Sequence, residues 1–260
     1  MEQEKLDIIY MDQHIVAVNK PSGLLVHKSP IDKHETRYAM KILRDQIGQW
    51  VYPVHRLDKP TSGLLLFALS PEIAKLIGEQ FADNRVKKTY IAIVRGHTRL
   101  GGIIRHPLKE TAMFKHQKKL VEKRAPQDAL TLYRRLATTE CPYSIDRYPT
   151  TRYSLIFAYP RTGRTHQIRK HLKHISHPII GDAKHGKGNL NRAFSEHHNS
   201  HRLLLAAVSI KFQHPVTETP LCLYAPLQQD FKAVMRSLGW DETCLPSTQY
   251  NSEVTAITQP

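Results

Sequence analysis

An uninterrupted apolar run, Ser62–Leu69 with the sequence SGLLLFAL, constrains the fold of this chain more than any other feature. A short run of this kind, bounded by polar turn residues, is typical of a buried strand. Because successive side chains point to opposite faces, a strand that is apolar throughout must be covered on both sides. The run therefore predicts the central strand of a sheet, and 260 residues suffice to enclose it in one mixed domain or two fused halves.

Other segments predict the elements around this strand. Two extended runs, Asp7–Tyr10 and Ile15–Asn19, form a hairpin that is followed by a turn at Lys20–Gly23. A helix should cover Pro71–Ala82, because Ser70 offers an N-cap hydroxyl and proline suits the first helical position. Further helices are expected at 36–47, 165–175 and 228–238, and further strands at 88–94, 130–136, 153–159 and 203–210.

The charge balance indicates the class of partner. The chain carries 38 Lys and Arg residues against 23 Asp and Glu, a net charge of +15, which favours polyanions and first of all nucleic acid. A basic surface that serves only solubility is the alternative that charge alone leaves open. Lysine is dense between Phe114 and Arg124, and we interpret residues 115–124 as a mobile basic loop.

The cysteines and the chain ends bear on the compartment. The three cysteines are widely separated and include no CxxC pair, which suits a reducing environment. The N-terminal segment is acidic where a signal peptide is basic, and no window approaches the roughly 20 apolar residues that span a bilayer. We therefore expect a cytoplasmic protein, with Pro246–Pro260 as a polar, disordered tail.

A polar turn, His55–Gly63, stands directly before the apolar strand and holds the most interesting carboxylate. Pro60 biases the preceding residue away from helix, and the hydroxyls of Thr61 and Ser62 can bond local amides. The turn thus looks built to hold Asp58 at the edge of the core. An aspartate that only closes the turn through its own side chain is an equally good interpretation of these residues alone.

The segment HRLDKPTSGLLLFALS at 55–70 resembles the signature of the RluA family of RNA pseudouridine synthases, in which HRLD precedes a TSG-containing turn. The resemblance covers most of the chain. It includes Val18–Gly23, Lys88–Tyr90, Gly163–Arg169 and His177–Asp182, each similar to a further family motif. One departure is visible at Leu203–Ala207, where relatives often have a histidine before an alanine and this chain has none, so no role can be given to a histidine there.

The resemblance implies an α+β fold: a mixed, mostly antiparallel sheet flanked by helices, with a central active-site cleft. It implies one catalytic domain over residues 1–245, without the additional N-terminal RNA-binding domain of the S4 type that some relatives carry, and a tail over 246–260. A monomer is expected, because nothing in the sequence demands a partner chain.

The same resemblance assigns the chemistry. Moving uracil from a nitrogen link to a carbon link on ribose needs a carboxylate near C1′ and C6 and a base for the C5 proton. Asp58 is the implied carboxylate, Arg169 its ion-pair partner, and Tyr90 the ring that stacks on uracil and can accept the C5 proton. Attack on the base, attack on the sugar and a glycal route all remain open. No cofactor is implied.

RNA contacts are assigned to basic and polar residues beside these motifs. Arg56 is the expected occupant of the space that a flipped-out uridine leaves, and phosphate contacts are expected from the basic residues around it. The predicted RNA-binding residues are Arg56, His55, Arg164, His166 and Lys88, with weaker assignments for Lys170, Lys173 and the 115–124 run. The numerous histidines match neither HExxH nor a Cys/His zinc pattern, so no metal is expected.

A narrower likeness concerns the substrate. Arg44–Gln49, Arg147–Tyr153 and Pro178–Gly186 resemble members of the family that modify uridine 65 of tRNA. Ribosomal RNA is the alternative substrate. Two alternatives from other classes are a non-catalytic RNA-binding module that kept the fold, against which the intact Asp58, Tyr90 and Arg169 argue, and a histidine-rich, metal-dependent nuclease.

Overall fold

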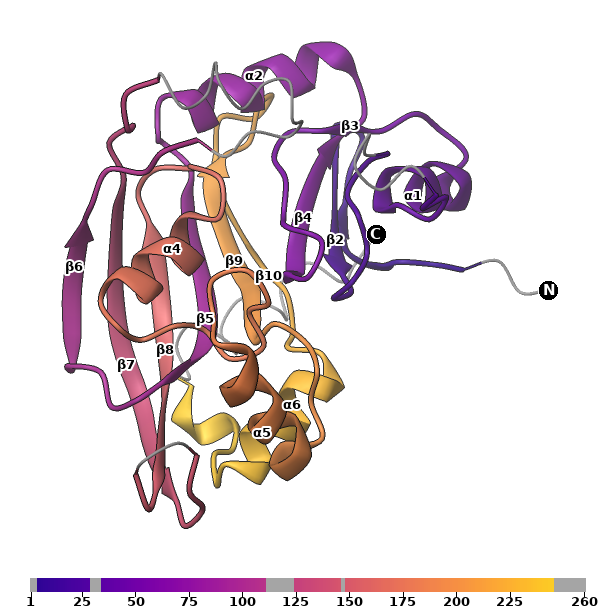
Figure 1. Ribbon diagram of the computed structural model, residues 1–260. Helices are drawn as coiled ribbons and strands as arrows, with labels where there is room; N and C mark the ends of the chain where they lie inside the picture. Colours follow the sequence, from indigo (N-terminus) through magenta and orange to yellow (C-terminus); the bar gives the residue numbers. More distant parts are fainter. Residues whose placement is uncertain (1–3, 29–33, 111–123, 146–147, 246–260) are drawn as a thin grey trace.

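The computed structural model describes residues 4–28, 34–110, 124–145 and 148–245 (Figure 1). Two predictions fall outside these ranges: the tail at 246–260, and the basic loop at 115–124 except for its last residue. In the described part of the chain, no helix combines the length and the apolar character needed to cross a membrane.

One twisted sheet of ten strands forms the centre of the described structure, in the order β1-β2-β4-β9-β5-β8-β7-β6. β3 pairs with β4 and β10 pairs with β9. Among the described strand pairs only β4 and β9 run parallel, so the sheet is mixed and mostly antiparallel, as expected. The strands are β1 (Asp7–Met11), β2 (Ile15–Lys20), β3 (Tyr52–Pro53), β4 (Ser62–Ala68), β5 (Lys87–Arg95), β6 (Gly101–Arg105), β7 (Leu130–Cys141), β8 (Thr151–Pro160), β9 (Leu205–Gln213) and β10 (Pro220–Tyr224).

Helices cover both faces of this sheet (Figure 1). They are α1 (Ala39–Ile47), α2 (Pro71–Ala82), α4 (Gln167–His174), α5 (Gly188–His198) and α6 (Gln229–Ser237), with a short 3₁₀ turn η2 (Glu242–Cys244).

The apolar strand β4 is buried at every position, which confirms its prediction as the central element. Leu65 packs into the cluster that contains α1, while the adjacent Leu66 packs into the cluster that contains α2. Alternation along the strand thus sends successive side chains into two different cores. We refer to β1 to β4 with α1 and α2 as the N-terminal half.

The remaining strands and helices form the C-terminal half, which is layered in the same way. Ile168 and Leu172 of α4 pack against β5 and β8 on one face of the sheet. Phe194 of α5 and Phe231 of α6 pack on the other face. Each half of the chain therefore has helices on both sides of its strands.

The two halves join where β4 runs beside β9, over only two residue pairs, Ser62 with Ala206 and Gly63 with Ala207. Gly63 has a φ of +103°, and a Cβ there would lie 2.1 Å from the carbonyl oxygen of Ala207. Only glycine lets the backbones approach this closely. The turn that carries Asp58 precedes this junction directly.

Most predicted elements are confirmed, with shifts at their ends. The first helix starts at Ala39 rather than residue 36 and ends at Ile47, as expected, and Gly48 follows it with a left-handed φ of 72°. β9 starts at Leu205, two residues later than expected. The Leu204 amide donates to the Ile180 carbonyl at 2.9 Å, while the Leu204 carbonyl accepts from the Ile93 amide of β5. β3, β6, β10 and α5 were not predicted.

Candidate active site

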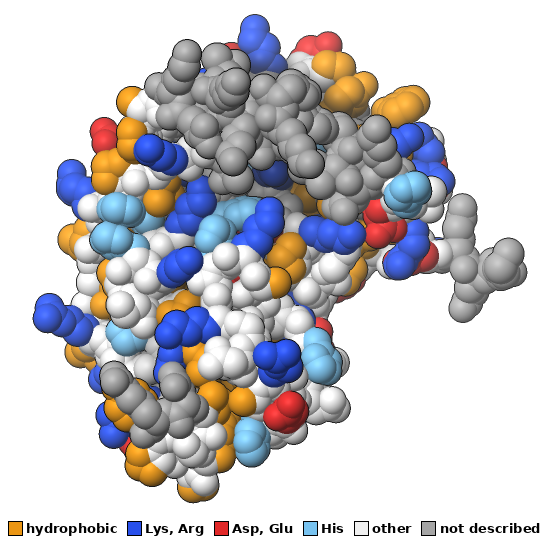
Figure 2. Space-filling view, viewed as in Figure 1, with side chains coloured by type: hydrophobic (Ala, Val, Ile, Leu, Met, Phe, Trp, Pro, Cys, Tyr) orange, Lys and Arg blue, Asp and Glu red, His pale blue; other side chains and the backbone are white. Residues whose placement is uncertain are grey.

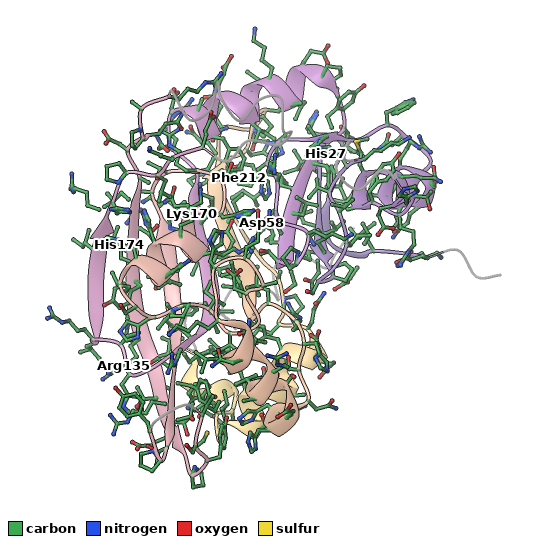
Figure 3. All side chains as sticks on the ribbon, in the orientation of Figure 1. His27, Asp58, Arg135, Lys170, His174 and Phe212 are labelled. Atoms are coloured by element: carbon green, nitrogen blue, oxygen red, sulfur yellow. The ribbon has the colours of Figure 1, made fainter. Side chains whose placement is uncertain are left out.

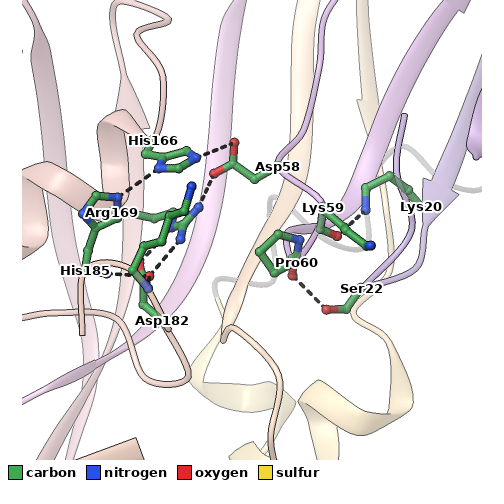
Figure 4. A network of polar contacts seen from close by, with 10 residues as sticks. Lys20, Ser22, Asp58, Lys59, Pro60, His166, Arg169, Asp182 and His185 are labelled. Carbon is green, nitrogen blue, oxygen red and sulfur yellow. Dashed lines mark hydrogen bonds and ion pairs between the residues drawn. The ribbon is translucent and has the colours of Figure 1, made fainter. Parts of the chain in front are cut away.

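The Asp58 turn is held from behind by the turn at 20–23. The backbone N–H of Gly23 and the ammonium of Lys20 both donate to the Lys59 carbonyl, at 2.9 and 3.1 Å. Ser22 donates its hydroxyl to the Pro60 carbonyl at 2.8 Å (Figure 4). Within the turn, the Thr61 amide donates to the Asp58 carbonyl at 2.9 Å. The carboxylate therefore projects from a backbone that is fixed on its far side.

Lys20 is fully buried, which is unusual for a lysine. Besides Lys59, its Nζ donates to the carbonyls of Pro21 and Leu24 at 2.8 and 2.7 Å. Burial lowers the pKa of Lys20 to about 7, while the Asp58 charge acts in the opposite direction. Because three carbonyls need three N–H donors, the geometry matches the ammonium form.

Helix α4 begins on a buried amide that is fully hydrogen-bonded. Oε1 of Gln167 accepts from the Thr162 hydroxyl and the Arg164 backbone, and Nε2 donates to Leu130 and to the hydroxyl of Thr131. These bonds fix the first turn of α4 to β7. With Ile168 and Leu172 of the same helix turned into the core, Arg169 is presented to the Asp58 turn.

Arg169 bridges two carboxylates. Its Nη1 donates to Oδ2 of Asp58 at 2.8 Å, and its Nε and Nη2 donate to the two oxygens of Asp182, both at 2.8 Å (Figure 4). Burial alone would lower the pKa of Arg169, but bonds to both carboxylates keep it raised. Burial would likewise raise the pKa of Asp182, but Arg169 and the His185 amide keep it lowered. Arg169 and Asp182 are thereby held in their charged forms.

Two histidines adjoin this bridge. His166 caps α4 with a left-handed φ of 54°, and its Nε2 lies 3.8 Å from Oδ1 of Asp58. Its Nδ1 lies 2.9 Å from Nε2 of His185. Burial lowers the pKa of His166 to about 4, although the Asp58 charge opposes this, and burial also lowers the pKa of His185. Both imidazoles are therefore neutral at neutral pH.

Strand β5 brings Lys88 and Tyr90 to the site. The register of β5 against β9 shifts between Thr89 and Tyr90, a bulge of the kind that redirects side chains beside active sites. Burial raises the pKa of the Tyr90 hydroxyl, and the Asp58 charge raises it further. Lys88 lies over the Phe81 ring at 5.8 Å, and burial lowers its pKa.

These groups surround a cavity of about 400 Å³, a size that suits a nucleoside. Asp58 lies at the centre of the molecule, between the two halves (Figure 3). The cavity is lined by Val54, His55, Arg56, Leu57, Asp58, Thr61, Phe81, Ala82, Lys88, Tyr90, Pro160, Thr162, Gly163, Arg164, His166, Gln167, Ile168, Arg169 and Leu205. The three residues assigned to catalysis (Asp58, Tyr90 and Arg169) and five of those assigned to RNA binding (Arg56, His55, Arg164, His166 and Lys88) are among them, whereas Lys170 and Lys173 are not.

The predicted RNA-binding residues differ in how freely they can act. Arg56 is exposed, and Arg164 is exposed while donating from Nε to the Asp128 carbonyl at 3.1 Å. His55 is engaged inside the protein: its Nε2 accepts from the Leu66 amide at 3.0 Å, and its ring stacks on Phe81. Burial, with the nearby Lys88 charge, lowers the pKa of His55 to about 3.

Sequence reasoning missed the supporting residues of the site. Asp182 lies in the motif His177–Asp182, but the sequence does not indicate that its side chain pairs with Arg169, because a loop separates the two residues. Lys20 was assigned only to a turn, because a lysine is expected at the surface. His185 lies in the segment Pro178–Gly186, and its spacing from His166 does not indicate that the two side chains are in contact.

The face of the molecule that carries α4 displays many Lys, Arg and His side chains and few acidic ones (Figure 2). This face therefore offers positive charge around the cavity.

Among the described residues, no group of three or more His, Cys, Asp or Glu side chains has the arrangement of a metal site.

Comparisons with known proteins agree with this geometry. A family model described as RNA pseudouridylate synthase matches residues 14–174. tRNA pseudouridine synthase C of Vibrio cholerae is 47% identical over 92% of this chain and 98% of that protein, and its counterpart in Pasteurella multocida is 48% identical over 91% and 97%. The solved structure of human RNA pseudouridylate synthase domain containing 1 is similar in fold, with a TM-score of 0.68 and 24% identity over 90% of this chain and 89% of that one.

Proposed function

Because this chain belongs to the RNA pseudouridylate synthase family, we propose that it isomerises uridine in tRNA to pseudouridine, with Asp58 as the catalytic carboxylate. The observation that supports this most directly is the Asp58–Arg169 pair at 2.8 Å, which lies at the wall of a nucleoside-sized cavity. The two relatives, each named a tRNA pseudouridine synthase C, support tRNA as the substrate. Uridine 65 is the proposed position.

The arrangement suits a carboxylate that must react while charged. Arg169 binds only Oδ2 of Asp58 and is itself held in place by Asp182, so Oδ1 carries no bond to the guanidinium. In the reaction the bond from N1 to C1′ breaks, the uracil turns, and a bond from C5 to C1′ forms. Asp58 assists by contact with the base or the ribose, and Tyr90 stacks on the uracil ring.

The remaining predicted residues are proposed to hold the RNA. A paired uridine must be flipped out to reach the cavity, at a cost of a few kcal/mol that an inserted side chain can offset. Arg56 is exposed beside Asp58 and fits that role, while Arg164 and Lys88 at the rim fit contacts with phosphates. His55 contributes by shaping the cavity wall. We further propose that the chain acts as a monomer in the cytoplasm, without a cofactor.

The test is an isomerisation assay with native enzyme and Asp58→Ala on unmodified tRNA. We expect the variant to bind tRNA but to form no pseudouridine, because the carboxylate is the reacting group. Mapping of pseudouridine in RNA from cells with and without the gene identifies the position. Loss of a site in ribosomal RNA instead of tRNA would contradict the substrate, and normal turnover of Asp58→Ala would contradict the mechanism. Full activity in EDTA is expected, which separates a synthase from a metal-dependent nuclease.

A further inference from the structure

The proposed reaction also requires proton transfers, and the proposed function does not assign the residues that carry these protons. When C5 has joined C1′, it still carries its hydrogen and must lose it as a proton, so that the bonding pair returns to the ring. N1 has lost its bond to the ribose and must gain a proton. One proton therefore leaves the base at C5 and one enters at N1, and some group at the cavity must exchange both.

Neither Tyr90 nor His55 by itself accounts for both proton transfers. Burial and the Asp58 charge raise the pKa of Tyr90, so the hydroxyl stays protonated and neutral at neutral pH and has no strong lone pair to offer. The Nε2 lone pair of His55 is occupied by the Leu66 amide. The roles predicted for Tyr90, stacking on the base and accepting the C5 proton, stay predictions.

His166 and His185 are placed differently. His166 lines the cavity, its Nε2 is 3.8 Å from Oδ1 of Asp58, and its Nδ1 is 2.9 Å from Nε2 of the half-buried His185 (Figure 4). Their rings meet edge to face, with centroids 5.2 Å apart. The two imidazoles are hydrogen-bonded to each other, and a shift of about 1 Å would bring Nε2 of His166 within hydrogen-bond distance of the reacting carboxylate, which would complete a connection toward the surface.

We propose that His166 and His185 form a proton relay that carries the C5 proton out of the cavity and returns a proton to N1. The inference rests on the proposed function. Asp58 Oδ1 first takes the C5 proton and passes it to Nε2 of His166. The Nδ1 proton of His166 then moves to Nε2 of His185, which releases its own Nδ1 proton to water.

The return step resets the relay. His185 takes a proton from water on Nδ1, its Nε2 proton moves to Nδ1 of His166, and His166 delivers its Nε2 proton to N1 of the uracil. After both steps each histidine has its first tautomer again, Asp58 is a carboxylate, and the base has exchanged one proton with water. No oxidant, reductant or metal takes part.

The charges around the pair favour this exchange. Asp58 faces His166 from the catalytic turn, with Arg169 and Lys184 on the other sides. Asp182 faces His185, together with Arg169, Lys170 and Lys173. Positive neighbours and burial keep each imidazole neutral between steps, so neither holds the proton that it receives. A permanently protonated histidine could not serve as an acceptor.

The test compares single-turnover rates on RNA carrying protium or deuterium at C5 of the target uridine. We choose His166→Asn, because asparagine tolerates the left-handed conformation at 166 and cannot pass a proton on. His185→Asn interrupts the relay away from the substrate, and His197→Asn, exposed on α5, is the matched control.

We expect His166→Asn to slow turnover by about 100-fold, the usual scale for a lost acid–base group, and to raise the C5 isotope effect well above that of the native enzyme. His185→Asn should change both quantities in the same direction by less, and His197→Asn should change neither. A slower His166→Asn enzyme with an unchanged isotope effect would mean that His166 only positions Asp58, and would overturn the relay alone. Absence of pseudouridine with the native enzyme would overturn the proposed function itself.

Discussion

The two halves of this molecule hold their parts of the site by different means. In the N-terminal half the Asp58 turn is fixed through its own backbone, with carbonyls of 59 and 60 bound by the turn at 20–23. In the C-terminal half the partners of Asp58 are held by side chains, through the Arg169–Asp182 bridge and the His166–His185 contact. Backbone bonds define where the carboxylate is, whereas buried ion pairs define its charge environment. Position and electrostatics are therefore separable in this protein, and mutations can address each one.

The largest effect is expected where the halves meet. Gly63→Ala would force a Cβ to within 2.1 Å of the Ala207 carbonyl oxygen, on a backbone whose φ of +103° suits only glycine. We expect loss of cooperative folding, seen as a lost or strongly lowered thermal transition. Gly78→Ala is the control, because a Cβ added at Gly78 within α2 would meet no atom within 4 Å, and alanine favours the helix. A native-like melting temperature for Gly63→Ala would show that the β4–β9 contact can open without harm.

Removal of the charge partner comes next. Arg169→Ala leaves Asp58 and the fully buried Asp182 without their shared guanidinium, and breaking a buried pair in this way costs about 3–5 kcal/mol. We expect kcat to fall by about 10²- to 10³-fold, the range seen for lost electrostatic groups. Arg169→Lys keeps the charge but lacks the planar fork, so it should recover only part of the rate. If Arg169→Ala has the same kinetics as the native enzyme, the ion pairs of the C-terminal half do not define the charge environment of Asp58.

The smallest effect is expected in the N-terminal half, where backbone contacts position Asp58. Lys20→Met would fill a similar volume but remove the ammonium donor from the carbonyls of Pro21, Leu24 and Lys59, of which Lys59 keeps its bond from the Gly23 amide. We expect the free energy of unfolding to fall by about 2 kcal/mol. The rate should fall by about tenfold while RNA affinity stays constant, because the carboxylate is displaced but the basic rim is intact. Lys5→Met, on an exposed side chain, is the control. A loss as large as that of Arg169→Ala would show that position and charge are not separable.

Local signals in the sequence were sufficient for much of the fold. Ser70 and Pro71 start α2 as predicted, with the Ser70 hydroxyl accepting from the Ile73 amide. The apolar pattern of β4 correctly indicated burial on both faces. By contrast, α5 buries only Leu190 and Phe194, too few apolar residues to produce a helical period, and β6 begins with two glycines that read as a turn.

The site was predicted by a different route. Spacing alone left Asp58 equally well explained as a turn residue, and only the resemblance linked it to Arg169 and Tyr90. The supporting contacts were not predicted, because they join residues that are distant in the chain, such as Arg169 and Asp182, or because they bury a charge, as at Lys20. Such contacts depend on tertiary packing and leave no local pattern.

The pairing of β4 with β9 has a consequence for synthesis on the ribosome. The acidic group is translated early, but the strand that seats its turn and the helix that carries its guanidinium are translated much later. Contacts between such distant segments form late in folding, because a long loop must first be closed. A nascent chain that still lacks this strand and this helix therefore has no complete active site. An incomplete enzyme of this kind does not break a glycosidic bond in RNA that it could not then rejoin.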